Sequence, residues 1–233
     1  MKKKFINPLL FALPIFFSAT EAYAQKGFNA GIDFGYNASF MFDNTKYAEV
    51  PYNIKFKAGP AYDIDLGFNW NDYYGVEIEG IYANMGANYE VMSTNKDYQK
   101  EFDLAYFQVP IMFKISGGDY PDRYTTMFGP TFGFLNSASM NSDSSANGEV
   151  KSSFKAPDFG VLLVTGGDLT IKNHLYLNIA LRIYYGLSTV NNNPAIITNS
   201  PSSNEKLSNA YIGLSIGLHN LFVKTKPDKP ANW

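Results

Sequence analysis

Four carboxylates recur at a spacing of two residues on two neighbouring stretches of the chain: Asp63 and Asp65, then Glu77 and Glu79. Both stretches alternate apolar and polar residues, which is typical of β-strands, and a short turn joins them into a hairpin. A turn centred on Asn71 places Asp65 opposite Glu77. The same register places Asp63 opposite Glu79. Like charges at this separation repel each other, so the four groups require counter-charges, protons or a bound cation.

Groups on other predicted strands extend this charge cluster. The inward face of the first strand adds a fifth acid, and three cations are candidates to compensate it. The predicted cluster is Asp33, Asp63, Asp65, Glu77, Glu79, Lys57, Lys114 and Arg182. We interpret it as a salt-bridged filling of a closed sheet, with a cation or proton site as the alternative. We assign no catalytic, cofactor-binding or metal-ligating set, and we expect no cofactor.

Nucleophilic catalysis is the other chemistry to consider, because it requires a nucleophile, a histidine and an acid close together. The chain has two histidines, His174 and His219, and no cysteine. Both histidines fall near strand ends, and neither has a catalytic motif around it. We therefore interpret them as polar fillers and predict no enzyme. The lack of cysteine also excludes disulfides and thiol chemistry.

Eight stretches with period-two alternation are expected to position these groups. They are 28–37, 56–69, 73–89, 101–116, 123–136, 155–169, 174–187 and 211–222. The sixth stretch is apolar on both faces around 161–164, so its inward face is undecided. The connections alternate between short turns and long Ser/Asn-rich loops, which we expect to be mobile. An even strand number with this alternation is typical of a bacterial outer-membrane barrel.

The content of the two faces distinguishes a membrane barrel from a soluble carrier. The apolar faces hold bulky residues almost without interruption, as an apolar band of ~25 Å requires. The opposite faces mix Gly and Ala with large polar residues, as a narrow lumen requires. Aromatic residues gather at predicted strand ends: Trp70, Tyr73, Tyr74, Tyr120 and Tyr124. The fold class predicted is all-β, an eight-stranded antiparallel up-and-down transmembrane β-barrel. A soluble lipocalin-like carrier is the alternative.

The two ends of the chain are expected to lie outside the barrel domain, 25–222. Residues 1–24 combine lysines, an apolar run and an Ala-Tyr-Ala site, which predicts a secretory signal peptide. Residues 223–233 read as a periplasmic Pro/Lys tail. Between these ends no run of about 18 apolar residues predicts a membrane helix. The formal net charge of -2, without a long basic run, argues against nucleic acid as a partner.

Three prolines fall inside predicted strands, at Pro60, Pro110 and Pro130. Proline removes a backbone donor from a ladder and is normally confined to edges or bulges. A closed barrel has no edge. We therefore expect β-bulges or gaps in the ladders at these three positions.

Two motifs carry a resemblance to a known family. "YFQVPIMFKI" (106–115) and "MFGPTFGF" (127–134) are similar to strands of the PorT-like outer-membrane β-barrel proteins, a group of small "porin family" barrels. The last strand, with Gly213, Ile216 and Leu218, also resembles an outer-membrane assembly signal.

The resemblance implies location in the cell outer membrane. It also implies outer-membrane lipids and the outer-membrane assembly machinery as partners. A non-catalytic structural or accessory role follows by analogy, with a component of a type IX-like secretion or surface-assembly machine as a further partner. The alternative is a small-solute or cation-binding porin-like barrel. A wide pore is not expected, because eight strands enclose an interior that side chains fill.

Overall fold

The computed structural model describes residues 26–44, 52–92, 96–118, 122–143, 147–172, 174–200 and 204–222. The predicted signal peptide and Pro/Lys tail lie outside the described residues, and so does Tyr120. Within the described ranges, strands dominate and form one ten-stranded antiparallel sheet. No helix in these ranges is long and apolar enough to cross a membrane.

Eight long strands form the wall of the barrel. They are β1 (Gly27–Asp43), β3 (Lys57–Asn69), β4 (Tyr74–Val91), β5 (Tyr98–Gly117), β6 (Arg123–Ser142), β8 (Pro157–Lys172), β9 (Leu175–Gly186) and β10 (Leu207–Phe222). The short strands β2 (Tyr52–Lys55) and β7 (Gly148–Glu149) pair with β4 and β6, and a single 3-10 turn, η3 (Lys151–Ser153), follows β7. Each long strand pairs with its neighbours in the chain.

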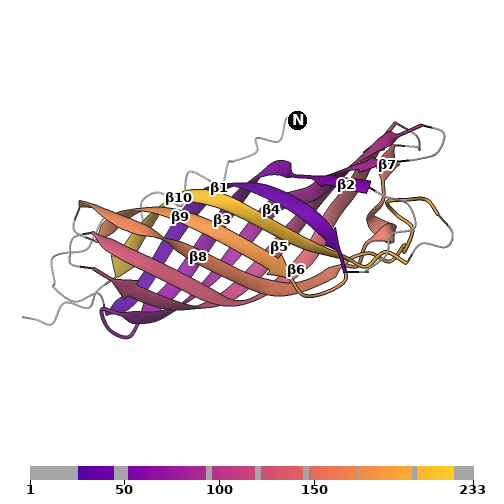
Figure 1. Cartoon of the computed structure of the whole chain (residues 1–233). Coiled ribbons are helices and arrows are strands. Elements are labelled where there is room, and N and C mark those ends of the chain that lie inside the picture. The colour runs from indigo at the N-terminus through magenta and orange to yellow at the C-terminus, as the bar shows by residue number, and fades with distance from the viewer. Residues whose placement is uncertain are drawn as a thin grey trace, which may run out of the picture.

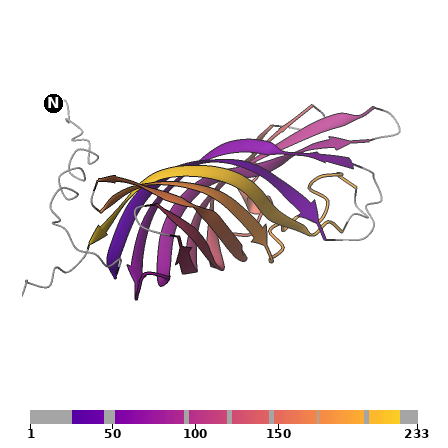
Figure 2. The same ribbon diagram turned by 60° about the vertical axis from the view of Figure 1, so that its left-hand side comes forward.

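The ring closes because β1 also pairs with β10, in register from Phe28 opposite Phe222 to Asp43 opposite Leu207. Figure 1 shows the closed wall from the side, and Figure 2 shows β1 and β10 lying next to each other. The predicted eight-stranded up-and-down barrel is confirmed. Several strands are longer than predicted; β6 continues to Ser142, where we expected a loop.

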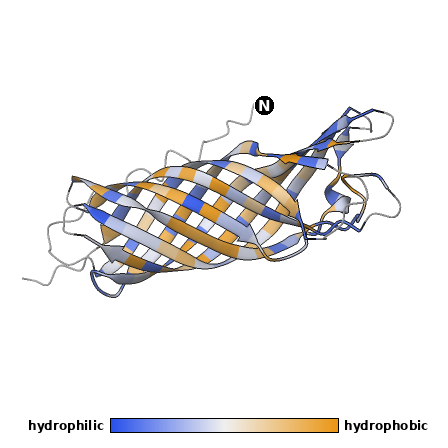
Figure 3. Cartoon of the chain, in the orientation of Figure 1, coloured by the Kyte–Doolittle hydropathy of each residue, from blue (hydrophilic) through white to orange (hydrophobic). Residues whose placement is uncertain are grey.

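The apolar faces of the strands point outward, as the membrane interpretation requires. Ile64 and Leu66 of β3 are 66% and 64% exposed, while Asp63 and Asp65, which alternate with them, are buried. Figure 3 shows the apolar and polar residues alternating along the wall. A lipocalin-like carrier would have the opposite arrangement, so the structure contradicts that alternative. Four of the predicted rim aromatics are exposed: Trp70, Tyr73, Tyr74 and Tyr124.

The barrel interior is polar towards the short turns and apolar towards the long loops. Buried apolar side chains fill the loop end, including Ile81, Met85, Leu162 and Val164. Their presence explains why the sixth predicted strand is apolar on both faces around 161–164: the strand meets lipid on its outer face and the core on its inner face. The inward face of the sixth strand, β8, therefore carries Leu162 and Val164.

A lid, residues 187–200 and 204–206, covers the loop end of this core. Ile196 and Ile197 are buried in it, and Lys100 of β5 donates a hydrogen bond to the Ile196 carbonyl at 2.8 Å. The Glu205 carboxylate accepts hydrogen bonds from the Ile197 and Thr198 amides at 2.8 and 3.0 Å. We expected this Ser/Asn-rich segment to be mobile. Its described residues instead pack as part of the core.

Lys100 joins the lid to a part of β5 beyond the outward apolar band, which runs from Phe107 to Ile115 on this strand. Burial lowers the pKa of Lys100 to about 8, and the negative charge of Glu205 opposes this shift. The ammonium group is held by the Ile196 carbonyl and by Asn199 Oδ1, both at 2.8 Å. The lid is therefore fixed to the wall by buried polar contacts.

Each of the three prolines adjoins an interruption in a ladder. Pro110 lies in a gap of the β4–β5 ladder, and Pro130 lies in a gap of the β5–β6 ladder. The β3–β4 ladder ends at Ala61, the residue after Pro60. A further register shift in β5, at Ala105, involves no proline. The expectation of bulges or gaps is met at all three prolines.

The gap at Pro130 generates a prediction, because β5 and β6 approach each other closely there. A Cβ atom at Gly129 would overlap the carbonyl oxygen of Ile111. We predict that Gly129→Ala lowers the free energy of unfolding by about 1–3 kcal/mol. The measurement is a urea titration that follows the folded form on unboiled detergent gels. Gly80→Ala is the control, since a Cβ there lies 3.5 Å from Phe107 and makes ordinary contact; equal urea midpoints for both variants would contradict the prediction.

The lid generates a second prediction. Glu205→Ala removes the acceptor of the Ile197 and Thr198 amides. Because hydrogen bonds to a charged group contribute about 1.5–3 kcal/mol, these amides are expected to exchange with deuterium at least tenfold faster. The control is Glu90→Ala, which removes a surface ion pair with Lys55. Unchanged exchange in Glu205→Ala would show that the lid does not depend on this carboxylate.

Candidate functional site

Glycines make room for the polar side chains in the narrow lumen. The inward face of β1 alternates polar residues with glycine, and Gly31 lies between Asn29 and Asp33. A Cβ atom at Gly31 would overlap the carboxylate of Asp65 from β3. A Cβ atom at Gly217 of β10 would overlap the carboxylate of Asp33. The space left by these two glycines lets side chains from three adjacent strands, β3, β1 and β10, occupy one layer of the lumen.

The register of the β3–β4 hairpin differs from the predicted one. Asp65 lies opposite Glu79, and Glu77 lies opposite Gly67. Asp63 lies opposite Ile81. The prediction that pairs Asp65 with Glu77 and Asp63 with Glu79 is therefore wrong by two residues. The acids still share the lumen face, because a shift of two residues preserves the side of the sheet.

The cause of the shift is the turn between the strands. Four residues, Trp70 to Tyr73, form the turn, and the Trp70 amide donates to the Tyr74 carbonyl at 2.9 Å. The Asn71 Oδ1 atom accepts hydrogen bonds from the backbone amides of Tyr73 and Tyr74 at 2.8 and 2.9 Å. This side-chain cap favours the longer turn and moves its centre from Asn71 to Asp72.

Two permanent cations compensate three of the acids. The Arg182 guanidinium of β9 donates to Asp63 at 2.8 Å and to Glu79 at 2.9 Å, and all three side chains are buried. Lys114 of β5 donates to Glu77 at 3.0 Å. Arg182 therefore connects β9 to β3 and β4 across the lumen, while Lys114 joins adjacent strands.

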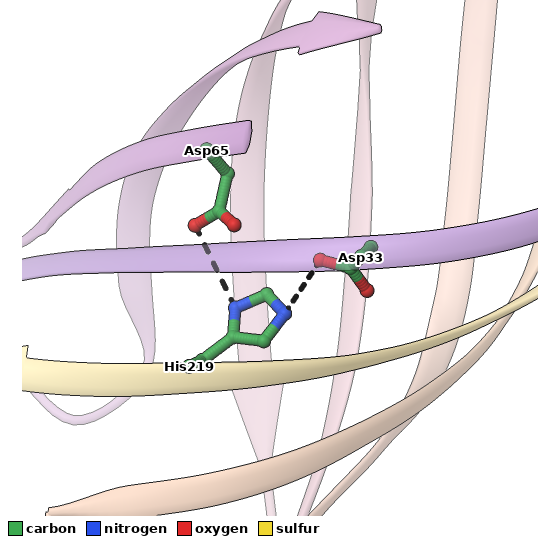
Figure 4. A group of neighbouring side chains, drawn as sticks. All are labelled: Asp33, Asp65 and His219. Carbon is green, nitrogen blue, oxygen red and sulfur yellow. Dashed lines mark ion pairs between the residues drawn. The ribbon is translucent and has the colours of Figure 1, made fainter. Parts of the chain in front are cut away.

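His219 serves the two remaining acids. Its Nε2 atom lies 2.8 Å from Asp33 Oδ2, and its Nδ1 atom lies 3.6 Å from Asp65 Oδ1. Figure 4 shows the imidazole between the two carboxylates. His219 was predicted to be a polar filler, and its contact with the two acids was not predicted. The signal that finds it is the pairing of the first and last strands, which sets His219 opposite Gly31.

Lys57 lies apart from the other predicted residues. It sits at the loop end of β3, where it forms ion pairs with Glu101 and with Asp103, the latter at 2.7 Å. Both acids are about half exposed. The prediction that Lys57 belongs to the charge cluster is therefore wrong. The structure brings together Asp33, Asp63, Asp65, Glu77, Glu79, Lys114 and Arg182 with His219, and we name this set the lumen charge cluster.

The lumen charge cluster is approached from the end with the short turns. A cavity of about 30 Å³ opens there, and its lining includes Asn29, Lys114, Asp168 and His219. This volume admits one or two water molecules. His174 lies in the β8–β9 turn at the same end, where its carbonyl accepts from the Leu221 amide at 2.9 Å. His219 thus borders both the cavity and the buried acids.

Comparison with known protein families agrees with this geometry. Residues 20–192 match the model of the outer membrane protein beta-barrel domain family, which is well over half of the chain. The chain belongs to this family. This outer-membrane barrel is accordingly located in the cell outer membrane, as predicted. No curated protein matches the sequence significantly.

Two solved structures resemble this outer-membrane barrel in fold. Neisserial surface protein A is 14% identical, with 84% of this chain and 97% of that chain covered and a TM-score of 0.50. The outer membrane protein OprG from Pseudomonas aeruginosa is 12% identical, with 85% and 97% covered and a TM-score of 0.51. At these identities the likeness concerns the fold alone.

We predict that Arg182, inside the lumen charge cluster, stabilises the barrel more than Lys57, which lies outside it. Arg182→Ala leaves Asp63 and Glu79 buried without their cation, and we expect the free energy of unfolding to fall by about 3–5 kcal/mol. The matched control is Lys57→Ala, whose partners are half exposed, with an expected loss below about 1 kcal/mol. Urea titrations of both variants measure the difference. If Arg182→Ala unfolds at the wild-type midpoint, the cluster does not stabilise the barrel.

Proposed function

We propose that this outer-membrane barrel is a non-catalytic structural or accessory protein whose transmembrane part is a plug. The observation that carries the proposal is that buried side chains of the described residues occupy both ends of the lumen. The lumen charge cluster occupies the end with the short turns, and the apolar core and the lid occupy the other end. The membrane part therefore serves as an anchor for what it carries on either side.

The ion pairs of Arg182 oppose passage of a solute. Arg182 crosses from β9 to β3 and β4, so a solute that follows the lumen must break its contacts with Asp63 and Glu79. Breaking a buried ion pair costs about 3–5 kcal/mol. The apolar core beyond it must also open, because protein interiors are close-packed. The small-solute alternative is disfavoured on these grounds.

Strands that project beyond the apolar band supply a surface for the accessory role. The ends of β5 and β6, together with β7, extend past the barrel wall (Figure 1). The lid holds β5 at this end through Lys100. The resemblance of 106–115 and 127–134 to PorT-like proteins supports service to a secretion or surface-assembly machine.

Conductance in a planar bilayer tests the plug. We expect the wild-type barrel to give no stable porin-sized conductance, because the lumen is filled. The comparison is a triple variant, Arg182→Ala with Asp63→Ala and Glu79→Ala. It removes the bridge across the lumen but leaves the apolar core, so its conductance should stay below that of a porin. A large, steady conductance of the wild-type protein would overturn the plug.

A deletion strain tests the accessory role separately. The strain is expected to lose proteins from its surface or its secreted fraction, and quantitative mass spectrometry of both fractions measures the loss. Complementation with the wild-type chain should restore them. If both fractions stay unchanged in the deletion strain, the proposed role in export or surface assembly is contradicted. The proposal that the lumen is plugged is not affected by this result.

A further inference from the structure

The charges of the lumen charge cluster do not balance. Its five carboxylates face two permanently charged cations, Lys114 and Arg182. These cations lie within 3.0 Å of Glu77, Asp63 and Glu79. Asp33 and Asp65 are left with His219, whose imidazole is not permanently charged. Two buried carboxylates therefore share one titratable ring.

Asp65 is the least compensated of the acids. Its side chain is buried, the residue being 3% exposed, and neither carboxylate oxygen accepts a hydrogen bond. Its ion pair with His219 Nδ1, at 3.6 Å, is beyond hydrogen-bond distance. Asp33 Oδ2 and His219 Nε2 also lack a hydrogen bond, although they lie 2.8 Å apart. A buried carboxylate without donors is costly unless another charge approaches it.

We propose that Asp33, Asp65 and His219 form a binding site for a divalent transition-metal ion of the Zn²⁺ type. One ligand atom from each residue can be chosen so that all three lie within 4.8 Å of one another. Zinc binds histidine nitrogen and carboxylate oxygen at about 2.0–2.2 Å. One ion takes one ring nitrogen, so the imidazole has to rotate out from between the two carboxylates to bring the three ligand atoms around it. The imidazole ligand favours this class of metal over Ca²⁺ and Mg²⁺, which prefer oxygen.

The surroundings suit an ion that enters from the short-turn end. The cavity beside His219 is large enough for a water molecule, which a three-residue site needs as a further ligand. Gly31 and Gly217 leave the space in which the two carboxylates lie. Lys114 also lines the cavity, but its charge is paired with Glu77. Two positive charges from the ion would match the two carboxylates that Lys114 and Arg182 leave uncompensated.

Zinc binding to the purified protein tests the proposal. The protein is isolated from outer membranes in detergent without a histidine tag, treated with a chelator and dialysed against ZnCl₂. Elemental analysis should find one zinc ion per chain. Asp65→Asn and His219→Gln should weaken binding by more than about 100-fold, because loss of outer contacts alone weakens metal sites 10–100-fold. His174→Gln is the matched control, since the chain has two histidines, and it should bind like wild type.

A second readout keeps the test independent of variant folding. The heat-dependent shift on a detergent gel verifies that each variant is a closed barrel. Co²⁺ bound to the wild-type chain should show visible absorption bands of a site with nitrogen and oxygen ligands. A wild-type barrel that binds no stoichiometric zinc overturns the proposal. Equal loss of binding in His174→Gln and His219→Gln also overturns it.

Discussion

Pairing between the first and the last long strand is the interaction on which the rest of the structure depends. The β1–β10 ladder closes the ring, so every long strand has two partners and the ring of eight long strands has no open edge. Closure also satisfies the backbone polar groups that lipid cannot satisfy. An eight-stranded ring is narrow, and this width dictates the contents of the lumen. Several large polar side chains fit because a neighbouring strand offers a glycine, as Gly217 does for Asp33.

The two halves of the lumen stabilise the barrel by different means. Apolar side chains such as Phe102 and Leu162 pack in the half beneath the lid, where burial of apolar surface supplies the favourable free energy. Ion pairs occupy the other half and contribute less net stability, because desolvation offsets their attraction. The ion pairs instead specify the strand register. If one strand shifts by two residues, Arg182 no longer contacts both Asp63 and Glu79, and two buried acids lose their cation.

Period two was sufficient to predict the number of long strands and, except for β8, the face that each strand turns to lipid. Register was harder, because the Asn71 side chain selects a four-residue turn that alternation does not reveal. Lys57 was misplaced because the pattern continues beyond the apolar band, where the strand leaves the lumen. The role of His219 depends on a neighbour near the opposite end of the chain. The packing of the lid against the core was not predicted, because its buried residues Ile196 and Ile197 lie within a polar segment.

The order of the lumen charges along the chain has a consequence for biogenesis. All five acids lie on β1, β3 and β4, whereas Lys114, Arg182 and His219 lie on β5, β9 and β10. A nascent chain emerges from its N-terminus, so the acids are made before the groups that neutralise them. The early hairpins therefore carry a charged inner face that lipid does not accept. The charges of the lumen are therefore compensated only when the later strands have joined the ring, because Lys114, Arg182 and His219 all lie on them.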